Sequence, residues 1–199
     1  TPGRVIFNEM LRQFNKDMPP EKQVAFRNKA LDKGGLREVV GECHRKLGSK
    51  RTAEIVDAMK RLGFRFATKS GMSVAVADVE IPAKKAEMLA AAEGEVEQIE
   101  REFRRGLLTE NERYEQVIEV WTRVTDDLTK ELERILDPYG LVYTLANSGA
   151  TKARFKQIRQ LAGMRGLMAD PSGRIIDLPI RSNFREGLTV LEYFVSTHG

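Results

Sequence analysis

The sequence has 199 residues, of which 41% are hydrophobic and 31% charged, with a formal net charge of +4. This length accommodates one ordinary domain or two small ones. The one cysteine, Cys43, excludes an internal disulfide framework and indicates a reducing, cytoplasmic setting, and the two histidines, His44 and His198, are too far apart in sequence for a metal-ligand spacing. No apolar run approaches the roughly 18 residues of a membrane span, so we expect no membrane association.

Residues 1–63 are typical of a small packed helical segment. A short apolar element precedes a helix expected over about 21–31, and two clearer helices follow, ended by Gly48 and Gly63. The apolar faces of these two helices consist of Leu36, Val39, Val40, Cys43 and Leu47, and of Ile55, Val56, Met59 and Leu62. Alternating apolar residues over 64–81 then predict one or two short strands.

The stretch 82–136 predicts two long helices folded back on each other. Pro82 suits a first helical position. Gly106 ends the first arm, and Thr109 with Glu112 forms a capping box that begins the second. Each arm carries one narrow apolar stripe, the seam of an antiparallel coiled coil. The stripes are Met88, Ala92, Val96, Ile99 and Phe103, and Tyr114, Val117, Ile118, Trp121, Val124, Leu128, Leu132 and Ile135.

A basic, glycine-hinged segment follows Pro138. Residues 151–165 contain five basic side chains and no acidic one, and three apolar residues are spaced to anchor one helical face. The basic residues are Lys152, Arg154, Lys156, Arg159 and Arg165, and the anchors are Phe155, Ile158 and Leu161. A solvated helix face explains the charge alone, whereas a phosphate site, on a nucleic-acid backbone or a nucleoside triphosphate, is the functional alternative.

Two further signals lie near the end of the sequence. The stretch 170–173, Asp-Pro-Ser-Gly, is typical of a type I turn and predicts a small β-hairpin between Leu167-Met168 and Ile175-Ile176. Thr189 and Glu192 form a second capping box that opens a final helix. Because the sequence begins without methionine and stops inside this helix, we expect it to be a piece of a longer polypeptide. The expected fold class is mainly α with minor β: short helices, a long antiparallel coiled-coil hairpin and a small β-hairpin.

Two pairs of reactive side chains receive little weight as sites. Cys43 and His44 are adjacent, but no third group stands nearby to orient the imidazole. Asp126 and Asp127 point about 100° apart on a long helix and are expected to be solvated. No phosphate-binding glycine pattern, serine-histidine-aspartate set or carboxylate dyad is present.

Long ungapped stretches of the sequence resemble the large beta-prime subunit of bacterial RNA polymerase. The most specific are SGATKARFKQIRQLAGMRGLMADPSGRIIDLPI and SNFREGLTVLEYFVSTHG, and the similarity extends upstream to TPGRVIFNEML and RTAEIVDAMKRLGFRFATKSGMSVAVADVEIP and to GLLTENERYEQVIEVWT in the hairpin. It covers essentially the whole chain and is weakest over 12–35.

The resemblance implies four segments. Residues 1–63 would belong to the pore region, and 64–145 to the funnel around a secondary channel through which nucleoside triphosphates enter. The hairpin 82–136 would be the rim coiled coil, on whose tip transcript-cleavage and channel-binding regulators dock. Residues 146–187 would hold the loop beside the bridge helix and the trigger loop, and 188–199 the start of the bridge helix.

The resemblance also implies site residues. Gln160, Met164 and Arg165 would form the loop near the nucleotide. Many family members have arginine where this chain has Thr151, so Lys152 or Arg154 would supply the charge for nucleotide phosphates. The resemblance places regulator docking near the hairpin tip, and the two arginines and two leucines expected at this exposed turn indicate the docking residues: Arg104, Arg105, Leu107 and Leu108. Capping of the coiled-coil seam is an equal alternative for Leu108.

The resemblance assigns catalysis to other parts of the enzyme. The family's nucleotidyltransferase centre holds Mg²⁺ on an Asn-Ala-Asp-Phe-Asp-Gly-Asp motif, which this sequence lacks, so no catalytic or metal residue and no bound cofactor are expected here and the piece alone would be inactive. Expected partners are the beta, alpha, omega and sigma subunits, template DNA, RNA, nucleoside triphosphates and the channel-binding regulators. The main alternative is a stand-alone coiled-coil scaffold that binds partner proteins or nucleic acid. An unrelated nucleotide-dependent enzyme is a third, less favoured alternative, because the sequence lacks a phosphate-binding loop and a carboxylate cluster.

Overall fold

A computed structural model describes residues 1–151 and 154–197 of the chain. The chain forms two compact units, Thr1–Ser73 and Val74–Gly199. Seven α-helices and two short 3-10 helices lie in the described ranges, which contain no β-strand. The expected mainly α fold class is therefore confirmed. No helix of these ranges combines the length and the apolar character that crossing a membrane requires.

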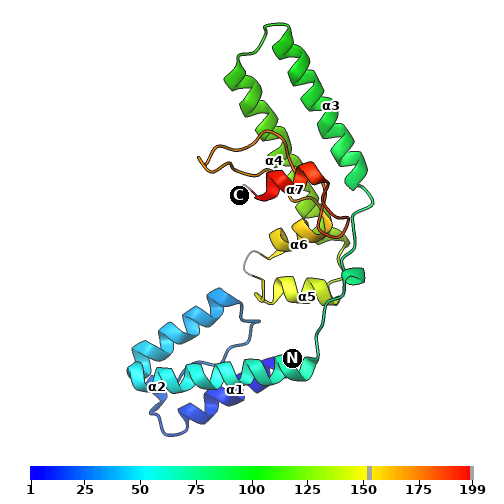
Figure 1. The fold of residues 1–199 in the computed structure, drawn as a ribbon. Coiled ribbons are helices and arrows are strands. Elements are labelled where there is room, and N and C mark those ends of the chain that lie inside the picture. The colour runs from blue at the N-terminus through cyan, green and yellow to red at the C-terminus, as the bar shows by residue number, and fades with distance from the viewer. Residues whose placement is uncertain (152–153, 198–199) are drawn as a thin grey trace. The chain divides into compact units, whose positions relative to one another are not determined.

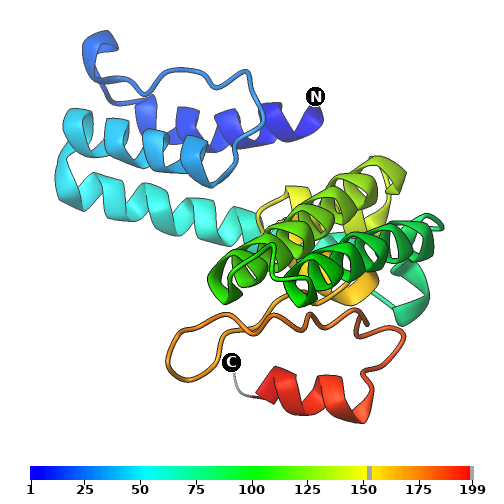
Figure 2. The ribbon, with the colours of Figure 1, turned by 90° about the horizontal axis from the view of Figure 1, so that it is seen from above.

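The first unit consists of α1 (Pro2–Asn15), the 3-10 helix η1 (Pro20–Lys22) and α2 (Lys33–Ser70). Gly48 has a φ of 73° and breaks α2 into two helical halves, as the sequence indicated. Figure 2 shows α1 and these two halves as three helical rods. Their inner faces share one hydrophobic core, which contains Met10, Leu11, Val24, Val39, Cys43 and Ile55.

The helix expected over 21–31 was wrong. Apart from η1, this segment is irregular, and two asparagines of α1 hold its backbone. Asn15 exchanges two hydrogen bonds with the backbone of Val24, at 2.9 and 3.0 Å, and Asn8 binds the backbone of Arg27 in the same way, at 2.7 and 2.8 Å. These side chains satisfy backbone groups that a helix would have paired internally, so the tertiary contact replaces the local one.

The expected end of α2 at Gly63 was also wrong, because the helix continues to Ser70. A single glycine inside a helix costs only about 1 kcal/mol, which its neighbours can offset. The helix ends instead at Gly71, whose φ of 59° is left-handed. The strands expected over 64–81 are therefore absent from the described residues; this stretch holds the end of α2, an irregular segment and the 3-10 helix η2 (Val76–Asp78).

The second unit is built on the expected helical hairpin, α3 (Lys85–Arg104) and α4 (Glu110–Ile135), which stands out as the long pair in Figure 1. Helix α3 begins three residues after Pro82, so the expected first helical position was wrong. The capping box of Thr109 and Glu112 is confirmed: the backbone N–H of each residue donates to the side chain of the other. The seam is confirmed as well, and it buries Ala92, Ile99, Val117, Val120, Trp121, Val124 and Leu128.

Two short helices pack at the base of the hairpin, α5 (Leu141–Asn147) and α6 (Phe155–Ala162). Ile158 of α6 joins a small core of Leu136, Val142 and Ala146, and Phe155 lies against Tyr143 with ring centroids 5.6 Å apart. Leu161 was wrongly expected as a third anchor, since it is 37% exposed and the adjacent Ala162 is buried instead.

Residues 163–189, called here the α6–α7 loop, lead to the final helix α7 (Val190–Thr197). The turn at Asp170 is present, with the Gly173 N–H donating to the Asp170 carbonyl at 2.9 Å. The expected β-hairpin is not formed. Within the described residues, backbone pairing there is limited to two isolated antiparallel bridges, Gly166 with Ile180 and Ala169 with Ile175, and side-chain contacts to α4 hold the segment as well. The second capping box is confirmed, since Thr189 and Glu192 exchange backbone-to-side-chain hydrogen bonds.

Candidate functional site

The α6–α7 loop is fixed to the end of α6 by one buried amide. The Asn183 side chain donates to the carbonyls of Ala162 and Gly163 at 3.0 and 3.1 Å and accepts the Glu186 N–H at 2.8 Å. It thereby occupies carbonyls that a helix end leaves unpaired. Gly163 allows this turn, because a Cβ there would lie 3.0 Å from the Arg159 carbonyl oxygen and 3.2 Å from a methyl carbon of Leu132.

The next residue, Met164, anchors the loop in the hairpin seam. Its side chain is fully buried in the cluster that contains Trp121 and Leu128. The Thr125 hydroxyl lies 3.8 Å from its sulfur. Met164, one of the residues expected near a nucleotide, thus attaches the loop to the coiled coil. This contact fixes where the following residue, Arg165, can reach.

Arg165 connects the loop to α7. Its Nη1 donates to the Ser196 hydroxyl at 2.6 Å, and its guanidinium carbon lies 5.3 Å from the centre of the Phe184 ring. Its backbone N–H donates to the Ser182 carbonyl at 3.1 Å. A guanidinium offers several donors in one plane, so it can hold a hydroxyl while it stacks on a ring. Arg165 therefore joins both sides of the loop to the final helix.

Glu192 forms a second connection between the loop and α7. Besides capping α7, its carboxylate accepts hydrogen bonds from the backbone N–H groups of Arg181 and Ser182, both at 3.0 Å, and from the Ser182 hydroxyl at 2.8 Å. Burial alone would raise the pKa of Glu192, but the hydrogen bonds from Thr189 and Ser182 outweigh it and lower the pKa to about 2. The side chain is therefore ionised at neutral pH.

The remaining basic residues of this region are distributed differently. Arg154, just before α6, is exposed with a φ of 47°, and Lys152 lies outside the described residues.

Two residues of α6 also contact the loop. The Gln160 carbonyl accepts the Phe184 N–H at 3.0 Å, so its backbone helps to hold the loop. Arg159 is turned inward: burial lowers its pKa, and Nη2 approaches the Arg165 carbonyl at 3.4 Å. The structure thus joins Gln160, Met164 and Arg165 in one assembly.

The four expected docking residues at the hairpin tip fall into two classes. Arg104, Arg105 and Leu107 are exposed, and Leu107 retains 61% of its accessible surface. Leu108 is partly buried and packs against the seam cluster. Leu107 is thus an exposed apolar side chain, whereas Leu108 packs against the seam.

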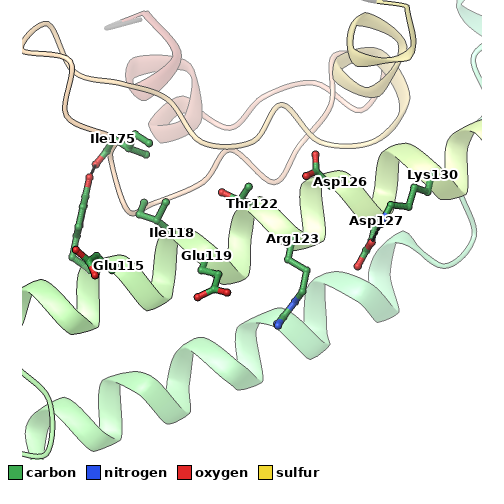
Figure 3. A pocket seen from close by; sticks show the side chains of 10 residues that line it. Glu115, Ile118, Glu119, Thr122, Arg123, Asp126, Asp127, Lys130 and Ile175 are labelled. Atoms are coloured by element: carbon green, nitrogen blue, oxygen red, sulfur yellow. Dashed lines mark hydrogen bonds and ion pairs between the residues drawn. The ribbon is translucent and has the colours of Figure 1, made fainter.

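A shallow groove of about 530 Å³ runs along α4 next to the α6–α7 loop (Figure 3). Its cations are already engaged: Arg123 points towards α3, where it pairs with Glu95, and Lys130 pairs with Asp127 at 2.8 Å. Ile175 of the loop forms one wall. Within the described ranges, no group of three or more histidine, cysteine, aspartate or glutamate side chains is arranged to hold a metal ion.

The adjacent Cys43 and His44 of the first unit do not form a reactive pair. Cys43 is fully buried, and this burial raises the pKa of its thiol. His44 is exposed, with its Nε2 3.3 Å from the Ser49 hydroxyl. A buried thiol with a raised pKa is a poor nucleophile, so the cysteine has a packing role.

Sequence reasoning missed Asn183 and Arg113. The spacing of Asn183 and Glu186 is a local capping pattern that could have drawn attention to Asn183. Its contact with α6 carried no signal, because that helix ends 21 residues earlier. Arg113 was not singled out by any motif or periodicity of the sequence. Its side chain lies among acidic groups of α3, α4 and the loop. Only the proximity of distant segments identifies such contacts.

Comparison with known proteins identifies the family. The family model "RNA polymerase Rpb1, domain 3" matches residues 1–79, and "RNA polymerase Rpb1, domain 4" matches 108–185. The chain is 54% identical over 199 residues to the DNA-directed RNA polymerase subunit beta' of Desulforamulus reducens. The chain belongs to the family of the RNA polymerase beta' subunit. The resemblance drawn from the sequence is thereby confirmed.

Other beta' subunits give the same result. The chain is 52% identical over 199 residues to that of Pelotomaculum thermopropionicum and 54% identical to that of Desulforudis audaxviator. In each case the whole chain is matched, and it spans 16% of the length of the relative. The similarity over the full chain favours the polymerase hypothesis over a stand-alone scaffold.

Proposed function

We propose that this chain is the part of a bacterial RNA polymerase that surrounds the nucleotide-entry channel and supports the moving elements beside the catalytic centre. In this proposal residues 1–63 form the pore region and 64–145 the funnel, with the rim coiled coil over 82–136. Residues 146–187 then form the supporting loop, and 188–199 begin the bridge helix. The enzyme would be a nucleotidyltransferase of the bacterial cytoplasm.

The observation that carries the proposal is the contact of Arg165 with Ser196. Together with Met164 in the hairpin seam, it attaches the loop both to the coiled coil and to α7. A loop that links a rigid hairpin to a helix can limit how that helix moves, and conformational steps of this kind set the rate of many enzymes. The contribution of this chain is therefore positioning.

The described residues do not fit a magnesium centre, since the convergent carboxylates that two-metal phosphoryl transfer requires are lacking among them. We therefore assign no chemical step to this chain. In the proposal Mg²⁺ is held by another part of the beta' subunit. Lys152 or Arg154 would supply positive charge for the phosphates of the incoming nucleotide.

The partners in this proposal are the beta, alpha, omega and sigma subunits, template DNA, RNA and nucleoside triphosphates. Transcript-cleavage factors and other channel-binding regulators would dock at Arg104, Arg105 and Leu107. Support comes from the exposure of these three side chains, which lie at and just after the C-terminal end of α3. An exposed leucine close to two arginines is a suitable contact for an apolar partner surface with acidic surroundings.

The experiment is single-nucleotide addition by the complete polymerase carrying Arg165→Ala. We expect the rate of addition to fall about tenfold, because the loop loses its contact with α7. Arg134→Ala is the matched control: it removes an exposed arginine of α4 whose partner, Glu131, lies in the same helix. Equal rates for the Arg165 variant and the unsubstituted enzyme would refute the positioning role.

A further inference from the structure

Arg113 lies among carboxylates from three separate segments. Its Nη1 is 2.9 Å from Glu100 of α3, and its Nη2 is 2.6 Å from Glu110 of α4 and 3.1 Å from Asp177 of the α6–α7 loop. Only 14% of its side chain is exposed. The guanidinium carbon also lies 5.6 Å from the centre of the Phe103 ring. One side chain thus connects both arms of the hairpin with the loop.

This arrangement requires arginine. The guanidinium has five N–H donors in a fixed plane, so it can reach carboxylates on different sides while one face lies on a ring. A lysine at this position has a single ammonium on a flexible stem and would reach fewer of the three partners. The pKa of Arg113 is raised by its hydrogen bond to Glu110 and by those to the other two carboxylates, in agreement with this geometry.

The neighbouring residue, Tyr114, attaches the same part of the loop. Its hydroxyl donates to the Ile175 carbonyl at 2.8 Å, and the Arg174 guanidinium carbon lies 4.7 Å from the centre of its ring. In Figure 3 Ile175 lies beside the start of α4. Asp177 and Ile175 belong to the segment that the Gly166–Ile180 bridge closes, called here the finger (residues 166–180). The finger is therefore pinned to α4 by two consecutive residues near the hairpin tip.

The two ends of the finger lie next to the contacts with α7. Gly166 follows Arg165 directly, and Ile180 precedes Arg181 and Ser182, whose N–H groups donate to Glu192 of α7. The Gly166 and Ile180 backbones exchange hydrogen bonds in both directions at 2.9 Å, so the two ends move together. A displacement of the finger at Asp177 would consequently change the position of Arg165.

We propose that Arg113 is a positioning residue that clamps the finger to the coiled coil and thereby couples the tip of the hairpin to Arg165 and α7. This inference rests on the proposed function, in which the tip is a docking point and Arg165 supports nucleotide addition. It adds a regulatory route: a partner that shifts the tip changes the position of the loop through Asp177, without approaching the nucleotide.

The test uses the complete polymerase with Asp177→Asn, Arg113→Lys and the double variant. Two readouts are taken: amide hydrogen exchange of residues 168–177, and kcat and KM for nucleotide addition. For each single variant we expect exchange of the finger to become about fivefold faster. We also expect kcat to fall about threefold with KM unchanged, because the clamp acts on closure rather than on nucleotide binding.

The controls separate coupling from general loss of stability. The double variant should be no worse than Arg113→Lys alone, since that substitution already weakens the contact with Asp177 that Asp177→Asn removes. Asp177→Glu keeps the negative charge. We expect the finger of this variant to exchange slowly, and its kcat to stay close to that of the unsubstituted enzyme. Asp57→Asn removes an aspartate of the first unit that pairs with Lys60 of its own helix, and it should alter neither readout.

The outcomes distinguish this inference from the function on which it rests. Unchanged exchange and unchanged kcat in Asp177→Asn, with the Arg165→Ala enzyme slowed, would overturn the clamp and leave the proposed function standing. Faster finger exchange in Asp177→Asn with additive single effects would also overturn it, because Arg113 and Asp177 would then act separately. If the finger loosens as expected but Arg165→Ala adds nucleotides normally, the proposed function fails while the structural clamp is upheld.

Discussion

Arg165 Nη1 donates a hydrogen bond of 2.6 Å to the Ser196 hydroxyl, across 31 residues of sequence. The two residues belong to the α6–α7 loop and to the last described turn of α7. Ser196 is buried although its neighbours on the helix are largely exposed. The contact therefore marks the face with which α7 lies on the loop, and it provides the most direct test of how the helix is held.

Removing the hydroxyl by Ser196→Ala should loosen α7. A hydrogen bond to a charged group contributes about 1.5–3 kcal/mol, and Arg165 would keep only its stacking on Phe184. We expect the opening free energy of α7, measured by amide hydrogen exchange, to fall by about 1–2 kcal/mol. Thr197→Ala is the matched control, because the Thr197 hydroxyl bonds only to the Phe194 carbonyl of the same helix. An equal effect of both substitutions would contradict a specific role of Arg165.

Glu192 should make the stability of the contact between α7 and the loop depend on pH. Its pKa is lowered from 4.5 to about 2, so the folded state favours the ionised carboxylate. The stabilisation is fully present above about pH 4.5 and is lost as the pH falls towards 2. Glu192→Gln should therefore destabilise the loop and α7 at pH 7, with a difference from the unsubstituted chain that shrinks below pH 4.5. Denaturant unfolding at a series of pH values measures this, and a difference that is constant from pH 7 to pH 3 would contradict it.

The two leucines of the hairpin tip should respond differently to substitution by serine. Leu108 packs against the seam cluster, so Leu108→Ser should lower the free energy of unfolding by about 1–3 kcal/mol. Leu107 is exposed, and Leu107→Ser should change stability by less than about 0.5 kcal/mol. Under the proposed function Leu107→Ser should nevertheless weaken regulator binding to the complete polymerase about tenfold. Normal binding by that variant would move the docking site away from the tip.

Gly163 should not tolerate a side chain. A Cβ would lie 3.0 Å from the Arg159 carbonyl oxygen, a backbone atom that cannot turn away. Gly163→Ala should therefore shift the start of the loop and cost about 1–3 kcal/mol of stability. Gly94→Ala is the matched control, because a Cβ at that helical position would meet no atom within 4 Å beyond its own helical backbone and chain neighbours, and there alanine should stabilise α3. Thermal unfolding of both variants measures these changes in stability. An unchanged stability of Gly163→Ala would contradict the close packing at this position.

The signals that succeeded in the sequence are local ones. Thr109 with Glu112 and Thr189 with Glu192 are capping boxes whose partners lie three residues apart, so the sequence contains the whole interaction. The seam of α3 and α4 follows from a repeat that only a buried helical stripe explains. The family similarity likewise depends on continuous stretches of sequence, and the comparisons confirmed it.

The expectations that failed involve competition between local and distant contacts. Residues 21–31 have helical propensity, but Asn8 and Asn15 bind their backbone in another conformation. The turn at Asp170 predicts a β-hairpin, but only isolated bridges form there, and Arg113 and Tyr114 bind the segment to α4. In both places side chains distant in sequence bind backbone or charged groups. The hydrophobic periodicity of the sequence does not predict such contacts.

The sequence by itself thus determined the mainly helical class, the coiled-coil hairpin with its caps, and the family. Each of these depends on residues within a few turns of one another or on contiguous motifs. Only the tertiary structure decided that Met164 belongs to the hairpin seam, that Arg165 bonds to Ser196 and that Asp177 meets Arg113. The last two of these contacts join residues 31 and 64 positions apart, and their formation depends on how the loop packs on the hairpin and α7.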